Sequence, residues 1–334
     1  MYPMIGMGQY LWIQALVTDS GCENVRDFFA GIAIISLTFL SATYIPLLGT
    51  VILLFSPLPI LYFYLKYGRI YVFFLFTVSF AFVAIVLHTY NQTPSIPIIF
   101  ASGALGIILS EVLRKKYSME LTILLPVILL LITWSSFLMY ETFSSGISLS
   151  RLIEIYVDRN IQENIKFYNK LEIPEETLTL IKNNAKQISS IFTDIFPSIG
   201  LISATFIVWI NVLSSRELFQ KKMPNYPNFG DLSHWKAPEK LVWLFITTGT
   251  MLFIPVEWIR FLSLNIFIVT LFIYFLQGIA ICSFFFKTKR IPRLFRFFFY
   301  FLIFTQQYLS LLIVATGLFD LWFDFRKYIS PVAD

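Results

Sequence analysis

Few side chains in this sequence could take part in chemistry, and those that could lie within or beside long apolar runs. Asp320 and Asp324 stand four residues apart, so both carboxylates would lie on one face of a helix. Such a pair could bind a cation, pair with Arg326 or cap the end of its helix. Gln277 lies in the middle of another apolar run, where an amide either holds helices together or contacts a ligand. These residues are the first candidates for a site.

Helix breakers give a second set of candidates. Pro57 and Pro59 interrupt one apolar run at mid-depth, and each proline frees carbonyl groups that need another donor. Broken helices of this kind often line substrate sites in transporters, although a simple kink is also an explanation. Gln306 and Gln307 lie in the last apolar run and would suit a similar break, with an amide within hydrogen-bonding reach of Gln277. The predicted ligand-binding residues are therefore Pro57, Pro59, Gln277, Gln306 and Gln307.

The remaining ionisable groups are interpreted as surface features. Glu111 precedes the basic residues 114–116 by one turn and is expected to pair with them. Glu257 and Arg260 are three residues apart and form a local pair on one helical face. His88 is interpreted as an interface residue, because it is a lone histidine at the end of an apolar run.

No pattern in the sequence predicts an enzyme. A phosphate-binding glycine loop, a nucleophile elbow and an HExxH helix are all missing from the sequence, so ATP hydrolysis by this chain is not expected. Two cysteines and two histidines exclude a disulfide framework and a histidine-rich metal centre. We therefore expect no catalytic residues, no metal and no cofactor. The net charge of +5 reflects membrane topology, and no nucleic-acid partner is expected.

The composition then sets the class of protein. Hydrophobic residues make up 57% and charged residues 13% of the chain. Soluble domains carry roughly 25% charged residues, so this chain has too few polar groups to cover a surface facing water. The apolar runs are long and do not alternate, and in lipid only a helix satisfies such a backbone internally. The sequence predicts an all-α polytopic transmembrane bundle of about eight or nine spans.

Nine stretches are long enough to cross a hydrocarbon core that needs about 20 apolar residues. They lie near Phe28–Tyr44, Leu47–Leu65, Ile70–Leu87, Pro97–Leu113, Met119–Tyr140, Phe196–Leu213, Leu241–Val256, Leu262–Phe286 and Phe297–Leu318. The count falls to eight if the last segment is re-entrant or if the stretches near 241–286 form one broken element.

The spans divide the chain into four parts. Residues 1–27 are interpreted as an interfacial N-terminal segment, and 28–141 as a five-span front bundle. Residues 142–193 carry both charge signs with apolar residues at helical spacing, which predicts an extracytoplasmic amphipathic hairpin. This hairpin rests on the membrane, covers a cavity as a lid or docks a partner. Residues 194–334 form a back bundle of three or four spans with a C-terminal tail.

The basic residues predict the orientation. Most of the 25 Lys and Arg residues fall in loops that are cytoplasmic if the N-terminus is inside, as the positive-inside rule requires. Nine spans would place Arg326 and Lys327 outside, against that rule, whereas a re-entrant last segment would return them to the inside.

Three stretches carry a resemblance to a known family. They are the Trp-Lys-Ala-Pro run at 235–238, YFLQGIA at 274–280 and GLFDLWFDFRK at 317–327. On these residues the chain resembles the YybS-like family of uncharacterised bacterial membrane proteins. The resemblance implies a bacterial cytoplasmic membrane. It marks six motif positions of unknown role: Trp235, Pro238, Gly278, Asp320, Asp324 and Arg326.

The resemblance also suggests a general plan. The family is distantly similar to the substrate-binding components of energy-coupling-factor importers, which depend on a separate ATPase. This chain has more spans and an added hairpin. Two hypotheses follow: a transporter-like or solute-binding protein without its own ATPase, or a non-transporting scaffold that uses the hairpin or the basic loops. The lipid bilayer is the expected partner, and a separate membrane or ATPase protein is a further candidate.

Overall fold

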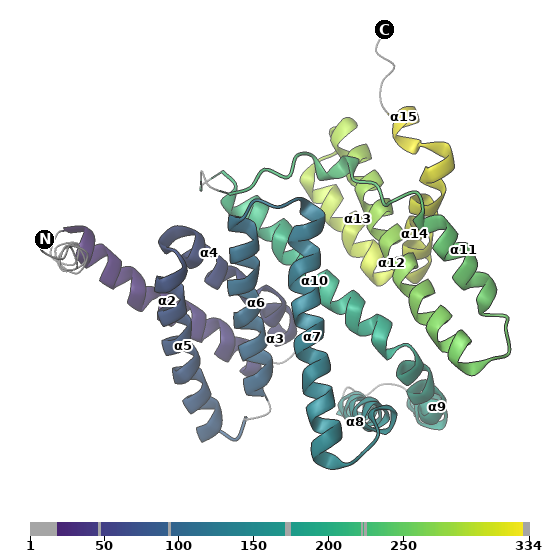
Figure 1. Cartoon of the computed structure of the whole chain (residues 1–334), viewed down its shortest axis with the longest axis horizontal. Coiled ribbons are helices and arrows are strands. Elements are labelled where there is room, and N and C mark those ends of the chain that lie inside the picture. The colour runs from purple at the N-terminus through teal and green to yellow at the C-terminus, as the bar shows by residue number, and fades with distance from the viewer. Residues whose placement is uncertain are drawn as a thin grey trace, which may run out of the picture. The chain divides into compact units, whose positions relative to one another are not determined.

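The computed structural model describes residues 19–45, 48–92, 95–170, 175–221, 223 and 226–329. Throughout these ranges the regular structure is helical (Figure 1). Most of the predicted segment 1–27 lies outside them. The chain divides into two compact units: residues 1–130 with 205–228, and residues 131–204 with 229–334.

The predicted all-α membrane fold is confirmed. Within the described ranges, seven helical stretches are long and apolar enough to cross a membrane. They are Val25–Tyr44, Leu48–Tyr67, Arg69–Thr89, Ile96–Arg114, Met119–Ser145, Phe196–Phe219 and Glu257–Thr288. An eighth is possible if the bent pair Arg293–Ile303 and Gln307–Phe323 counts as one span.

The first unit packs helices from the front of the chain. They are α2 (Asp19–Tyr44), α3 (Leu48–Phe55), α4 (Pro57–Tyr67), α5 (Arg69–Thr89) and α6 (Ile96–Arg114). The core contains Phe39, Ile60 and Leu75, none of which is exposed. A Cβ at Gly106 would lie 2.9 Å from the Pro57 carbonyl oxygen, so α6 packs directly on the backbone of α4.

The predicted break at Pro57 and Pro59 occurs at Ser56, between α3 and α4. The Ser56 hydroxyl donates to the Leu53 carbonyl at 2.8 Å. The Asn211 amide donates to the Leu54 carbonyl, also at 2.8 Å. The carbonyls beside the prolines are thus supplied with donors, as buried backbone requires.

The helices α7 (Met119–Ser145) and α10 (Phe196–Phe219) flank the predicted insert. Between them, α8 (Leu149–Lys170) and α9 (Glu175–Asp194) pack on each other as a helical pair. The end of α9 is joined to the second unit's longest helix, because the Asn265 amide donates to the Asp194 carbonyl at 2.8 Å.

The second unit is built around α12 (Glu257–Thr288), a helix of 32 residues. Around it lie the 3-10 turn η2 (Leu232–His234), α11 (Leu241–Met251), α13 (Arg293–Thr305), α14 (Gln307–Phe323) and α15 (Phe325–Ile329). These helices are drawn in green to yellow in Figure 1. The short α11 runs antiparallel to α12, with Phe245 stacked on Phe267 at 4.9 Å and Gly249 beside the same ring.

Only part of the predicted span Leu241–Val256 is helical in the structure. Its helix, α11, has 11 residues and is about 16 Å long at 1.5 Å per residue, about half of the hydrocarbon thickness. The chain reaches α11 through a segment at residues 235–240 that carries no helix. That segment and α11 together run along α12. Hydropathy reports how apolar a stretch is and does not report where its helix begins or ends.

The predicted span Phe297–Leu318 is also divided, at Gln306, as the two glutamines suggested. The axes of α13 and α14 differ by 102°. The start of α13 is tied to the end of α12, because Arg296 donates to the Phe286 carbonyl at 3.1 Å. The end of α14 returns to the same end of α12, as the contacts of Arg326 described below establish. Both ends of the bent pair therefore lie at the same end of α12.

Candidate functional site

The site is assembled where α12 and α14 cross. A Cβ at Gly278 would lie 2.1 Å from the Ile313 carbonyl oxygen, and one at Gly317 would lie 1.9 Å from the Tyr274 carbonyl oxygen. Neither carbonyl can move without displacing its helix, so only glycine fits at these two positions. The close approach brings Gln277 and Asp320 within reach of each other.

Asp320 is the centre of a buried polar cluster. Its Oδ2 accepts from Arg326 Nη1 at 2.7 Å and from Gln277 Nε2 at 3.1 Å. Its Oδ1 accepts from the Phe325 backbone N–H at 2.9 Å, which positions the turn into α15. The side chains of Asp320 and Arg326 are 0% and 7% exposed. A charge pair this deep persists only if its remaining donors and acceptors are satisfied.

The other partners of this cluster come from the segment 231–240, which comprises η2 and the non-helical stretch before α11. Arg326 donates to the Ser233 carbonyl at 3.1 Å and to the Trp235 carbonyl at 2.9 Å. Gln277 Oε1 accepts from the Ala237 backbone N–H at 3.1 Å. Buried backbone outside a helix needs hydrogen-bond partners from other protein groups. The cluster therefore supplies the hydrogen bonds that helix formation would otherwise have supplied.

Asp324 lies at the same turn and forms more exposed ion pairs. It adopts a left-handed conformation, with φ of 46°, at the end of α14. Its carboxylate pairs with Lys236 at 2.9 Å and with Lys327 at 3.1 Å. Hydrogen bonds from Lys236 and then Lys327 lower the pKa of this carboxyl group. The second predicted aspartate thus joins the tail to the segment before α11.

A third contact fixes that segment against the end of α12. Asp231 pairs with Lys287, and the His234 ring packs edge-on against Phe284 at 5.0 Å. Burial raises the pKa of Asp231, but the bonds from Lys287 and from Ser233 outweigh it and bring the pKa to about 2. The segment, the end of α12 and the C-terminal turn consequently meet at one end of the second unit.

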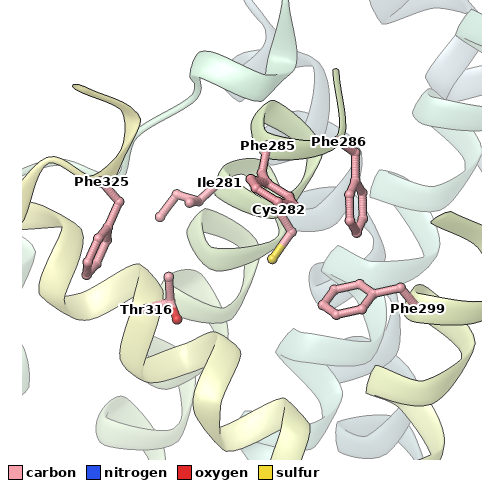
Figure 2. A pocket seen from close by; sticks show the side chains of 7 residues that line it. All are labelled: Ile281, Cys282, Phe285, Phe286, Phe299, Thr316 and Phe325. Carbon is pink, nitrogen blue, oxygen red and sulfur yellow. The ribbon is translucent and has the colours of Figure 1, made fainter. Parts of the chain in front are cut away.

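An apolar cavity of about 260 Å³ lies between α12 and the bent pair. Figure 2 shows its side chains surrounding a common space: Ile281, Cys282, Phe285, Phe286, Phe299, Thr316 and Phe325. The Thr316 hydroxyl is satisfied within its own helix, where it donates to the Leu312 carbonyl at 2.8 Å. The lining therefore favours an apolar occupant.

The predicted ligand-binding residues are distributed over the two units. Pro57 and Pro59 belong to the first unit, whereas Gln277 belongs to the second. The expected hydrogen bond between Gln277 and Gln306 or Gln307 is wrong, because Gln277 is bonded to Ala237 and Asp320. Both glutamines at the bend are exposed. None of these five residues lines the apolar cavity.

The motif positions, by contrast, converge. Gln277, Asp320 and Arg326 form the buried cluster, the Trp235 carbonyl accepts from Arg326, and Gly278 forms the helix crossing. The Pro238 carbonyl accepts from the Leu241 N–H at 2.9 Å and so begins α11.

Glu111, expected to pair with basic residues, accepts from the Tyr64 hydroxyl. Sequence reasoning missed the cavity, because phenylalanines in an apolar run carry no distinguishing signal.

Comparison with known proteins identifies the family of this chain. A family described as "Predicted membrane protein (DUF2232)" matches residues 33–321. The chain is 21% identical over 287 residues to "Uncharacterized protein YybS" of Bacillus subtilis (strain 168). The aligned region covers 81% of this chain and 88% of that protein. No solved structure matches it. The chain is a polytopic integral membrane protein that belongs to the DUF2232 family of membrane proteins.

Proposed function

We propose that this protein is a transporter-like binding protein for an amphipathic or apolar molecule, with no enzymatic reaction and no ATPase of its own. The observation that carries the proposal is the apolar cavity between α12 and the bent pair α13–α14. Its volume of about 260 Å³ is below the roughly 300–1,000 Å³ of drug-sized sites, which favours a slender occupant.

The surrounding architecture supports movement of a ligand. A re-entrant pair and a non-helical segment meet at a buried charge pair, and transporters build their sites from such interrupted elements. The exposed amides of Gln306 and Gln307 at the bend add polar groups beside the apolar cavity's helices.

The proposal includes an orientation. We place the N-terminus, the basic segment 287–296 and the C-terminal tail on the cytoplasmic side of a bacterial inner membrane. The pairing of the tail with residues 231–236 supports this, because it brings Arg326 and Lys327 to the side that holds most basic residues. The pair α8–α9 is then extracytoplasmic, since the end of α9 is bonded to Asn265, in the half of α12 away from Lys287.

A ligand screen tests the function. Purified protein in nanodiscs would be heated with fatty acids, phospholipids, isoprenoids, vitamins and nucleosides, because a ligand bound only by the folded state raises the unfolding temperature. We expect stabilisation by amphipathic or apolar compounds, and its loss in Cys282→Trp, which fills the cavity. A protein that no compound stabilises would favour the alternative of a non-transporting scaffold, which a pull-down with the full chain would then examine.

A further inference from the structure

We propose that the cavity holds one acyl chain of an anionic phospholipid from the surrounding bilayer, with the phosphate at the basic turn 287–296. This rests on the proposed function and names its ligand class. Two independent features meet here: the apolar lining of the cavity and the charge of the turn that joins its walls.

The turn lies at the end of the cavity. Phe285 and Phe286 line the cavity and immediately precede the turn, and Phe299 lines it from the second turn of α13. At a rise of 1.5 Å per residue, Lys289 lies about 4.5 Å from Phe286 along the axis of α12. A headgroup at the turn and a chain among the phenylalanines are therefore within the reach of one lipid.

The turn is strongly and uniformly basic. Residues 287–296 contain five cations and no acidic residue: Lys287, Lys289, Arg290, Arg293 and Arg296. Two of these are already engaged, since Lys287 pairs with Asp231 and Arg296 donates to the carbonyls of Ile291 and Phe286. In the part of the chain that the structure describes, no ion pair joins Lys289, Arg290 or Arg293, and all three are exposed. Three cations thus remain for an anionic headgroup, and basic clusters at this position attract anionic lipids.

The cavity suits an acyl chain better than a polar solute. Its two smallest side chains, Cys282 and Thr316, lie between aromatic walls (Figure 2). The Thr316 hydroxyl donates to the Leu312 carbonyl and the Cys282 thiol is only a weak donor, so the lining offers no strong hydrogen-bond donor to a sugar or an amino acid. A hydrocarbon chain requires none.

The chain provides a matched control for the charge. Lys115 and Lys116 end α6 as Lys289 and Arg290 end α12, and the second residue of each pair has a positive φ, 54° and 52°. Both pairs are exposed, but only the second adjoins the cavity. Thr77 likewise matches Thr316, because its hydroxyl donates to the carbonyl four residues earlier, at 2.7 Å.

The test is native mass spectrometry of the full chain, titrated with phosphatidylglycerol or with phosphatidylcholine of identical acyl chains. We expect phosphatidylglycerol to bind at least tenfold more tightly. K289Q/R290Q should reduce its affinity about 25-fold, since each cation near the surface contributes about a factor of five, whereas K115Q/K116Q should not. Thr316→Phe should abolish binding of both lipids, and Thr77→Phe should leave it intact.

Failure of the lipid proposal can be distinguished from failure of the proposed function. Equal affinity for the two lipids, with loss of both in Thr316→Phe, would overturn the anionic headgroup and leave the proposed function standing. Unchanged lipid binding in Thr316→Phe, with the protein still folded by its thermal transition, would overturn both.

Discussion

The Arg326 guanidinium donates to the Asp320 carboxylate at 2.7 Å, and both side chains are almost completely buried. The two residues stand six positions apart, on either side of the turn from α14 into α15. Through the remaining guanidinium nitrogens, Arg326 also reaches the carbonyls of Ser233 and Trp235, more than 90 residues earlier. One ion pair therefore closes the C-terminal turn and holds η2 and the stretch that follows it before α11.

Breaking this pair is predicted to destabilise the protein severely. Asp320→Asn or Arg326→Gln leaves a buried charge without its counter-ion, at a cost of about 3–5 kcal/mol. The double variant should cost less than the sum of the two, because it leaves no isolated charge. Reversible denaturation in mixed micelles would measure all three. Additive losses would mean that the two side chains do not act as a pair.

The crossing of α12 and α14 gives a second prediction. Gly317→Ala would place a methyl group 1.9 Å from the Tyr274 carbonyl oxygen, so the helices must separate. We expect a loss of about 1–3 kcal/mol, as for other overpacked sites. The control is Gly249→Ala, in α11, whose Cβ would be 3.3 Å from the Phe267 ring. The Phe267 ring would have to shift by only a few tenths of an ångström, so that change should cost clearly less than Gly317→Ala. Equal losses in the two variants would contradict the close approach.

The pair Asp231–Lys287 predicts a dependence of stability on pH. The pKa of Asp231 is lowered from 3.8 to about 2 in the folded protein. The folded state therefore binds fewer protons than the unfolded state between these values, and this contribution is complete above pH 4 and lost as the pH falls towards 2. Because both side chains are nearly half exposed, solvent screening keeps the effect small.

Thermal unfolding followed from pH 5 to pH 2 would measure this contribution. Asp231→Asn should flatten the curve over that range relative to the natural sequence. A curve of the same slope in both proteins would show that the pair contributes nothing.

Much of the fold can be predicted from the sequence, because the hydropathy of a membrane span is a local property. The runs at α5, α6 and α12 stand out by length and composition alone. The break at Gln306 is also readable, since two amides in an apolar run indicate an interrupted helix. The shortness of α11 is not readable, because Leu252, Phe253 and Ile254 continue the apolar run after the helix has ended.

The site was only partly predictable, for a related reason. Asp320, Arg326 and Gln277 stand out as polar residues in apolar surroundings, but their partners are carbonyl and N–H groups of the segment 233–237, which carry no sequence signal. Lys236 and Asp324 are 88 residues apart, so their pairing depends on the tertiary fold. The cavity depends on the angle between α13 and α14 at Gln306, which no single side chain determines.

The central claim is that the bent pair α13–α14 is re-entrant, so that the tail, the segment before α11 and the basic turn lie on one side of the membrane. Single cysteines at Tyr328, Glu239 and Lys289, and one at Lys166 in α8, would be introduced after replacing Cys22 and Cys282 with serine. An impermeant maleimide would then be added to intact cells and, separately, to inverted vesicles. We predict that Y328C, E239C and K289C label only in inverted vesicles and that K166C labels in intact cells. Labelling of Y328C together with K166C in intact cells would contradict the account.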